Sequence, residues 1–301
     1  MNKMLMVMLL ALMVPFGAAA QDSKGFQSFH IGAAEVTALQ DGYLNLDTSL
    51  LKGIDEAGIK ELLGSTAPVK TSVNAFVVRT GKHTFLIDAG SKGNAYGGSM
   101  GHLLEKMQQA GIDPASIEAV LLTHMHFDHV SNLLTADGKR AFPNATVRMA
   151  KAEYDYWLDP AQATSPERKQ NIEMLKTLLA PYEATGACKP FAPGEEPFPG
   201  VTALTQYGHT PGHTVYKIGK GKEAVWFIGD IIHYGDVQFA RPQVTVKFDT
   251  DSNKAMSNRV ELFREAEKQG AVLAGAHLAF PGMGRLAAKG SGYLWVPLRL
   301  P

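Results

Sequence analysis

The chain has 301 residues, of which 45% are hydrophobic, and its formal net charge is zero. This length supports one large or two small globular domains with a well-buried core. Proteins that bind nucleic acids through electrostatics carry a basic patch, and no run of clustered Lys and Arg occurs in this sequence, so the composition argues against a nucleic-acid partner.

The N-terminal segment differs in composition from the rest of the chain. Lys3 precedes an unbroken apolar stretch at 4–14, and small residues follow at Ala18 and Ala20. This order is typical of a secretory signal peptide, and the apolar stretch is short for a membrane span. We therefore predict a cleaved signal at 1–20 and an exported bacterial protein, periplasmic or secreted, that has no membrane contact after cleavage. An uncleaved anchor is the alternative.

After the signal, short apolar strands alternate with amphipathic helices, which is the pattern of an α/β domain. No Pro/Ser-rich linker divides the chain, so residues 21–301 are interpreted as a single domain. The predicted strands, in chain order, are 35–39, 74–79, 84–88, 117–123, 146–150, 201–207, 214–218, 224–229 and 271–276. Capping residues and glycine stops predict helices at 100–110, 166–179 and 252–269.

The stretch T-H-M-H-F-D-H-V follows one of these strands directly. Three histidines and an aspartate fall within six positions, although the chain has only ten histidines. A strand end would place His124 and His126 on a loop, and Asp128 and His129 at the start of the next helix. Imidazole and carboxylate ligands suit zinc, iron, manganese or cobalt. The motif therefore predicts two adjacent metal-binding points, and histidines exposed in a turn are the alternative.

Four ligands in one segment cannot complete two metal sites, so further ligands must come from elsewhere. His209 stands in G-H-T-P-G-H, Asp230 ends A-V-W-F-I-G-D, and His277 ends A-V-L-A-G-A-H. Each follows an apolar strand, where a sheet edge can hold a ligand rigidly. These three residues are the candidates that complete the metal centre.

These motifs, together with Asp88 in I-D-A-G, occur in the order found in metallo-β-lactamase-fold hydrolases, and the sequence resembles that family over nearly the whole mature chain. The resemblance implies an α/β fold, a four-layer αβ/βα sandwich with a dinuclear metal site at one edge. It also implies supporting roles for Asp88 and His213 beside the ligands. The implied ligands are His124, His126 and His209 for the first metal, Asp128, His129 and His277 for the second, and Asp230 as a bridge.

Two divalent metal ions, zinc first and iron, manganese or cobalt as alternatives, explain what such a site would do. Two ions can share one water and lower its pKa from about 15.7 toward about 7, which supplies a hydroxide at neutral pH. One ion also polarises the C=O or P=O group of the substrate. Asp128 is expected to help move a proton to the leaving group. The sequence thus predicts hydrolysis by direct attack; an exported protein that only stores or senses metal is a remote alternative.

Several further stretches resemble the subgroup that contains methyl parathion hydrolase and related lactonases and arylesterases. They include V-T-A-L-Q-D-G, T-S-V-N and H-L-A-F-P-G-M-G. Members of this subgroup are typically exported homodimers with a hydrophobic pocket, so we expect a homodimer. Asp230 sets the sequence apart from true β-lactamases, which lack a bridging carboxylate. The candidate pocket aromatics are Tyr96, Trp157, Phe248 and Phe280.

His233 marks a departure from the phosphotriesterases of this subgroup, which carry an apolar residue there, whereas acyl-homoserine lactonases carry a tyrosine. A polar, protonatable side chain can bind an ester or lactone, or assist the leaving group, so His233 is a candidate catalytic residue. Phe248 would further narrow the space for a bulky phosphotriester. We therefore predict hydrolysis of hydrophobic lactones or aryl esters, with organophosphate triesters as a side activity. A dedicated organophosphate hydrolase is the alternative.

Cys188 is the only cysteine in the sequence, so the chain cannot form an internal disulfide. No histidine lies near it in sequence. We interpret it as a buried structural thiol rather than as a nucleophile.

Overall fold

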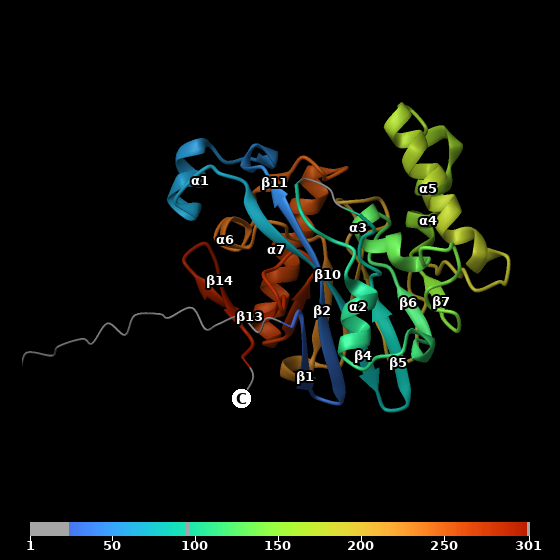
Figure 1. The fold of residues 1–301 in the computed structure, drawn as a ribbon. Helices are drawn as coiled ribbons and strands as arrows, with labels where there is room; N and C mark the ends of the chain where they lie inside the picture. Colours follow the sequence, from blue (N-terminus) through green and yellow to red (C-terminus); the bar gives the residue numbers. More distant parts are fainter. Residues whose placement is uncertain (1–23, 94–96, 300–301) are drawn as a thin grey trace, which may run out of the picture.

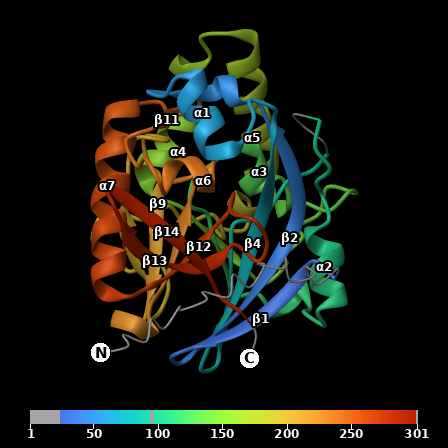
Figure 2. The ribbon, with the colours of Figure 1, turned by 90° about the vertical axis from the view of Figure 1, so that its left-hand side faces the viewer.

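The computed structural model describes residues 24–93 and 97–299 of the protein. Within these ranges, two six-stranded sheets pack face to face, and helices cover their outer faces (Figures 1 and 2). Figure 2 shows α7 and α2 on opposite sides of the paired sheets. The predicted α/β sandwich is therefore confirmed. The proposed signal segment at 1–20 and Tyr96 lie outside the described residues.

The first sheet has the order β1-β2-β4-β5-β6-β7. Neighbouring strands from β1 to β5 are antiparallel, whereas β5, β6 and β7 are parallel. Because parallel strands end at the same edge of a sheet, the loops after β5 and β6 emerge together. The bounds are β1 Phe26–Ile31, β2 Ala34–Leu46, β4 Val69–Thr80, β5 His83–Ile87, β6 Ala119–Leu121 and β7 Thr146–Arg148.

The second sheet has the order β14-β13-β12-β10-β9-β8. Strands β10 and β12 are parallel, and the other pairs are antiparallel, so the loops after β10 and β12 also emerge together. The bounds are β8 Thr202–Thr205, β9 Thr214–Ile218, β10 Val225–Gly229, β12 Val272–Gly275, β13 Met283–Lys289 and β14 Gly292–Pro297. A short pair, β3 Leu51–Lys52 and β11 Thr245–Val246, lies apart from both sheets.

Three hydrophobic layers hold the sandwich together. One lies between the sheets, one between the first sheet and α2, α4 and α5, and one between the second sheet and α7. Each fully buried Leu, Val or Phe side chain in them stabilises the fold by about 1.5–3 kcal/mol. The helices are α1 Glu56–Leu63, α2 Leu103–Gln109, α3 Phe127–Val130, α4 Lys151–Leu158, α5 Pro166–Glu183, α6 Gly235–Gln238 and α7 Ser252–Gln269. Single 3₁₀ turns occupy Thr48–Leu50, Pro114–Ser116, Ser131–Leu133, Pro160–Gln162 and Gly221–Glu223.

Helix α7 illustrates how local signals set an element's bounds. The Asp251 side chain accepts a hydrogen bond from the Lys254 backbone N–H, and Gly270 ends the helix with φ 63°. A left-handed conformation at this position favours glycine, because glycine has no Cβ atom to clash with the backbone.

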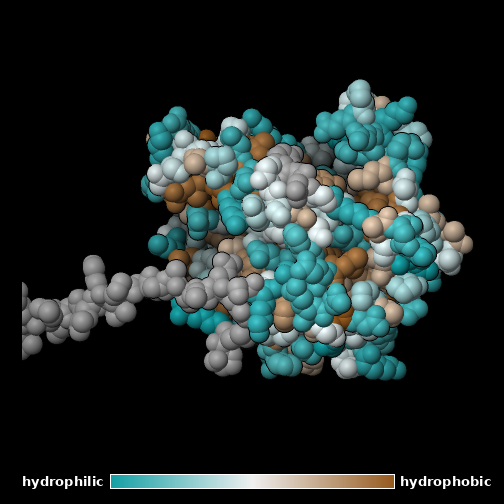
Figure 3. Space-filling model, viewed as in Figure 1, coloured by the Kyte–Doolittle hydropathy of each residue, from teal (hydrophilic) through white to brown (hydrophobic). Residues whose placement is uncertain are grey.

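No helix in the described ranges is long and apolar enough to cross a membrane. On the face shown in Figure 3, hydrophobic residues form only small separate patches on a mostly hydrophilic surface.

Candidate metal centre and its pocket

The candidate ligands emerge from strand ends at one edge of the sandwich. His124 follows β6 and Asp230 follows β10, while His277 lies two residues after β12. Since β6 and β10 belong to different sheets, the two sheets bring their ligands to a common point only through the packing of the sandwich. His129 lies on α3, a single helical turn that begins at Phe127.

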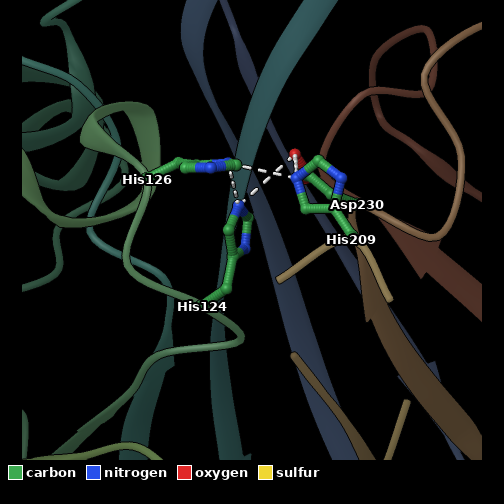
Figure 4. Close-up of side chains that lie close together, drawn as sticks. All are labelled: His124, His126, His209 and Asp230. Atoms are coloured by element: carbon green, nitrogen blue, oxygen red, sulfur yellow. Dashed lines mark hydrogen bonds and ion pairs between the residues drawn. The ribbon is translucent and has the colours of Figure 1, made fainter. Parts of the chain in front are cut away.

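His124, His126 and His209 form the first cluster, and their side chains point toward one another in Figure 4. The His126 Nδ1 atom lies 2.9 Å from His124 Nε2 and 3.1 Å from His209 Nε2. Asp230 Oδ2 lies 3.5 Å from His124 Nε2 and 3.2 Å from His209 Nε2. Four potential ligand atoms therefore surround one point.

Asp128, His129 and His277 form the second cluster on the other side of Asp230. The Asp230 Oδ1 atom lies 3.1 Å from His129 Nε2 and 3.2 Å from His277 Nε2. Asp128 Oδ2 lies 3.6 Å and 3.4 Å from the same two nitrogens. The two oxygens of Asp230 thus face two different histidine clusters, which is the geometry of a bridging carboxylate.

The spacing and chemistry of these atoms fit two divalent metal ions. Tetrahedral zinc with bonds of about 2.0–2.1 Å holds its ligand atoms about 3.3 Å apart, close to the separations in both clusters. His129 Nε2 and Asp230 Oδ1 are buried, and neither forms a hydrogen bond within the described residues. Buried polar atoms that lack such partners and converge on one point are the signature of a cation site. The nitrogen and oxygen donors suit zinc, and equally iron, manganese or cobalt.

Most ligand rings are fixed from behind through their other nitrogen atom. Such contacts select the ring tautomer and hold the ring plane, so they contribute strongly to metal affinity. Asp88 was expected to play this part, whereas the contacts of Ser72 and Asp249 were not predicted, because Ser72 acts through its backbone carbonyl and Asp249 stands in no recognisable motif. The contacts are His129 Nδ1 to Asp88 Oδ2 at 2.9 Å, His209 Nδ1 to Asp249 Oδ1 at 3.0 Å, and His277 Nδ1 to the Ser72 carbonyl oxygen at 3.0 Å.

Asp88 and His213 lie directly behind the ligands. The Asp88 carboxylate accepts hydrogen bonds from the backbone N–H of Thr123, at 2.7 Å, and from its hydroxyl, at 2.9 Å. It thereby fixes the residue that precedes His124. His213 Nε2 accepts a hydrogen bond of 3.0 Å from the backbone N–H of Asp230. Each residue therefore orients a segment that carries a ligand.

The electrostatics of the cluster favour a site that holds positive charge. Burial lowers the pKa of His124 and of His126 well below the usual histidine value, and the nearby histidines lower them further. Although burial opposes it, Asp230 and Asp249 raise the pKa of His209 to about 9. The surrounding histidines likewise hold the pKa of Asp230 well below its usual value despite burial. Asp230 therefore carries a negative charge between the two histidine clusters.

A cavity of about 530 Å³ opens onto this centre. It lies between the end of β2, the α4–α5 segment and the loop after β11, elements that flank the upper edge of the sandwich in Figure 1. Its walls differ in chemistry. The apolar lining residues are Leu44, Leu46, Phe127, Trp157 and Phe248, and the polar ones outside the metal centre are Thr164, Ser165, Glu167, Arg168, Asn171 and Thr250.

Of the residues assigned to the pocket from sequence, Trp157, Phe248 and His233 line this cavity. The structure corrects the assignment of Phe280, which is not among the described lining residues. Its side chain packs in the core between the sheets, with 6% of its surface exposed. Leu44 and Leu46 were missed because they alternate along a strand, a pattern that sequence alone cannot distinguish from ordinary core packing.

His233 lies where the cavity meets the metal centre. Its Nε2 atom lies 3.1 Å from Asp230 Oδ2, and its ring stacks on His277 with centroids 5.0 Å apart. The Phe248 ring lies 5.7 Å away on another side. His233 Nδ1 is buried without a hydrogen-bond partner among the described residues. His233 is therefore a polar group beside the site with unused hydrogen-bonding capacity.

The paired-sheet sandwich and the histidine and aspartate clusters at its edge place the protein in the class of metal-dependent hydrolases. The sequence pattern of the metallo-beta-lactamase superfamily matches residues 69–277, well over half of the chain, and the protein belongs to this superfamily. A search of curated protein sequences found no significant match.

Many solved structures share this fold, and three of them show the range of similarity. The hydrolase AbOPH of the beta-lactamase superfamily is 34% identical, with a TM-score of 0.85 over 92% of this chain and 98% of its own. AidC, a dizinc quorum-quenching lactonase in complex with a product, is 25% identical, with a TM-score of 0.81 over 92% and 98%. A probable metal-dependent hydrolase from Staphylococcus aureus is 19% identical, with a TM-score of 0.73 over 91% and 100%, and supports the fold alone.

Proposed function

We propose that the protein is a dinuclear metal hydrolase of hydrophobic lactones or aryl esters, and that organophosphate triesters are secondary substrates. The observation that carries this proposal is Asp230, whose two oxygens face two histidine clusters at the floor of a partly aromatic cavity. AidC, a lactonase by description, is similar over most of both chains, which supports a lactone substrate.

Two bound metal ions would supply an activated water and a Lewis acid for the substrate carbonyl. The protein's own residues would supply position and hydrogen bonds. His233 lies within 3.1 Å of Asp230 and keeps its Nδ1 atom unpaired among the described residues, so it can bind a carbonyl or leaving-group oxygen. Asp128 can carry a proton to the leaving group, because its carboxylate lies at the same floor of the cavity.

The cavity walls indicate how the rest of the substrate is held. Trp157 and Phe248 form an apolar surface suited to an acyl chain or aryl ring. Arg168 lies on the polar wall with its guanidinium 5.1 Å from the Trp157 ring, and its buried Nη1 atom has no hydrogen-bond partner among the described residues. A planar guanidinium with an unpaired N–H suits a carbonyl acceptor on the substrate, such as an amide beyond the lactone ring.

Turnover of three substrates by one metal-loaded preparation tests the proposal: an aryl lactone, an acyl-homoserine lactone and methyl paraoxon. We expect the lactones to have the highest kcat/KM. Preference for methyl paraoxon by orders of magnitude would identify a dedicated organophosphate hydrolase instead. Absence of turnover for all three would favour a protein that only stores or senses metal.

Export and dimer formation are part of the same proposal. N-terminal sequencing of the mature protein from a bacterial host should start near Gln21, and analytical ultracentrifugation should give twice the chain mass. A retained Met1 would indicate an uncleaved anchor or a protein that is not exported. A monomer at micromolar concentration would contradict the proposed homodimer.

A further inference from the structure

We propose that Glu153 is a positioning residue that ties together both histidine loops of the first metal cluster and the aromatic wall of the cavity. It lies in the first turn of α4 and is fully buried, with no exposed surface. It belongs to none of the ligand motifs. The proposal rests on the metal centre described above, but it concerns how that centre is held rather than what it hydrolyses.

Four donors converge on the Glu153 carboxylate. Oε1 accepts hydrogen bonds from the backbone N–H of Met125, at 2.9 Å, and from the indole N–H of Trp157, at 2.6 Å. Oε2 accepts hydrogen bonds from the hydroxyl of Thr210, at 2.7 Å, and from the backbone N–H of Gly212, at 2.8 Å. A buried carboxylate is costly unless such donors compensate it, so this arrangement specifies a single geometry.

The positions of these donors in the chain give the carboxylate its role. Met125 lies between the ligands His124 and His126, so its N–H fixes the backbone that aims both rings. Thr210 is the residue immediately after the ligand His209. One side chain therefore sets the distance between the two loops whose ligand nitrogens approach within 3.1 Å.

The same side chain also joins the metal centre to the cavity wall. Trp157, which Glu153 holds through its indole N–H, makes a T-shaped ring contact with His126 with centroids 5.4 Å apart. A shift of the Glu153 carboxylate would therefore move a ligand and a wall residue together. Metal binding and substrate contact are mechanically linked through this residue.

Gly212 provides an independent observation of the same contact. A Cβ atom on Gly212 would lie 2.2 Å from the backbone nitrogen of Glu153 and 2.5 Å from its Cα atom. The loop therefore packs directly against the backbone of α4, and only glycine permits this approach. The T-P-G sequence between His209 and His213 therefore supplies two hydrogen-bond donors to Glu153 and a glycine that lets the loop pack against α4.

The test compares the metal sites of Glu153→Gln and Glu153→Asp with that of the wild-type protein. Glutamine has nearly the same shape, but its amide nitrogen would face donors instead of accepting from them. We expect Glu153→Gln to weaken Co²⁺ binding about 10-fold or more in a chelator competition and to alter the visible spectrum of the Co²⁺ form. Aspartate keeps both acceptor oxygens, so Glu153→Asp should bind Co²⁺ more tightly than Glu153→Gln and more weakly than the wild-type protein.

Asp41→Asn is the matched control. Asp41 is also a fully buried carboxylate with four donors, namely the backbone N–H groups of Ser91, Gly101 and Leu103 and the side chain of Asn132. It holds the start of α2 and the Asn132 side chain, and among the described residues it contacts neither of the two histidine loops that Glu153 joins. This variant should lower the Tm without changing the Co²⁺ spectrum.

The proposal would be overturned if folded Glu153→Gln kept the wild-type Co²⁺ affinity and spectrum. It would also be overturned if the spectrum changed equally in Glu153→Gln and in Asp41→Asn. Should Glu153→Gln fail to fold, Thr210→Val removes a single donor while preserving side-chain shape. A wild-type spectrum in Thr210→Val would then count against the proposal, and a weakened site would support it. These readouts do not depend on turnover, so they stand apart from any failure of the proposed lactonase activity.

Discussion

Replacement of His233 by leucine tests which part of the cavity determines substrate preference. Leucine approximates the volume of histidine, so the substitution removes hydrogen-bonding capacity and leaves little empty space. The Nε2 atom of His233 lies 3.1 Å from Asp230 Oδ2, and its Nδ1 atom has no hydrogen-bond partner among the described residues. The change also extends the apolar surface that begins at Phe248, 5.7 Å from the imidazole ring. A lactone should lose a polar contact, and a phosphotriester should gain an apolar one.

The magnitude follows from the type of hydrogen bond that is lost. Burial lowers the pKa of His233 to about 4, so the imidazole is neutral, and a hydrogen bond between neutral groups contributes about 0.5–1.5 kcal/mol. Because about 1.4 kcal/mol corresponds to tenfold in rate, kcat/KM for the lactone should fall about 2- to 10-fold. The value for methyl paraoxon should stay constant or rise. The ratio of phosphotriester to lactone activity should therefore increase at least about twofold.

The assay measures kcat/KM for an acyl-homoserine lactone and for methyl paraoxon at the same metal loading. His30→Leu serves as the control, because His30 is exposed on β1 and lies in no ligand motif. An unchanged ratio would refute a role for His233 in substrate selection. An equal loss for both substrates would show instead that His233 acts by supporting Asp230.

Three further changes address the bridge, the polar wall and the thiol. Asp230→Asn removes the anion between the clusters, so bound zinc after dialysis should fall from two ions per chain toward one by elemental analysis; two retained ions would contradict the bridge. Arg168→Met should raise KM about tenfold for a lactone that carries an amide, and leave KM for a simple γ-lactone constant; equal shifts would exclude amide recognition. Burial raises the pKa of Cys188 from 9.0 to about 12, so its thiolate population at pH 8 should be about a thousandfold lower than that of an unperturbed thiol. Iodoacetamide labelling should therefore be slow in the folded protein and rapid in urea, and rapid labelling without urea would show that the thiol is accessible.

The main features of the fold were predictable because they depend on local signals. Apolar runs that end at glycine or aspartate gave the central strands, and the capping residues Asp251 and Gly270 gave the exact bounds of α7. Strands β1, β13 and β14 were not predicted. In β14 the residues Leu294 and Val296 are exposed, so the alternation of apolar and polar residues that identifies a half-buried strand is absent.

The candidate site shows the same difference between features that local sequence signals mark and features that arise from long-range packing. Ligands such as His124 and Asp230 could be proposed because each follows an apolar strand within a recognisable motif, and a strand end fixes where a side chain must lie. Glu153 and Asp249 carry no such mark. Glu153 meets Met125 and Thr210 from 28 and 57 residues away, and Asp249 meets His209 from 40 residues away. The identity of the ligands is thus encoded locally, whereas the contacts that aim them arise only when α4 and the loop after β11 pack against the sheet edge.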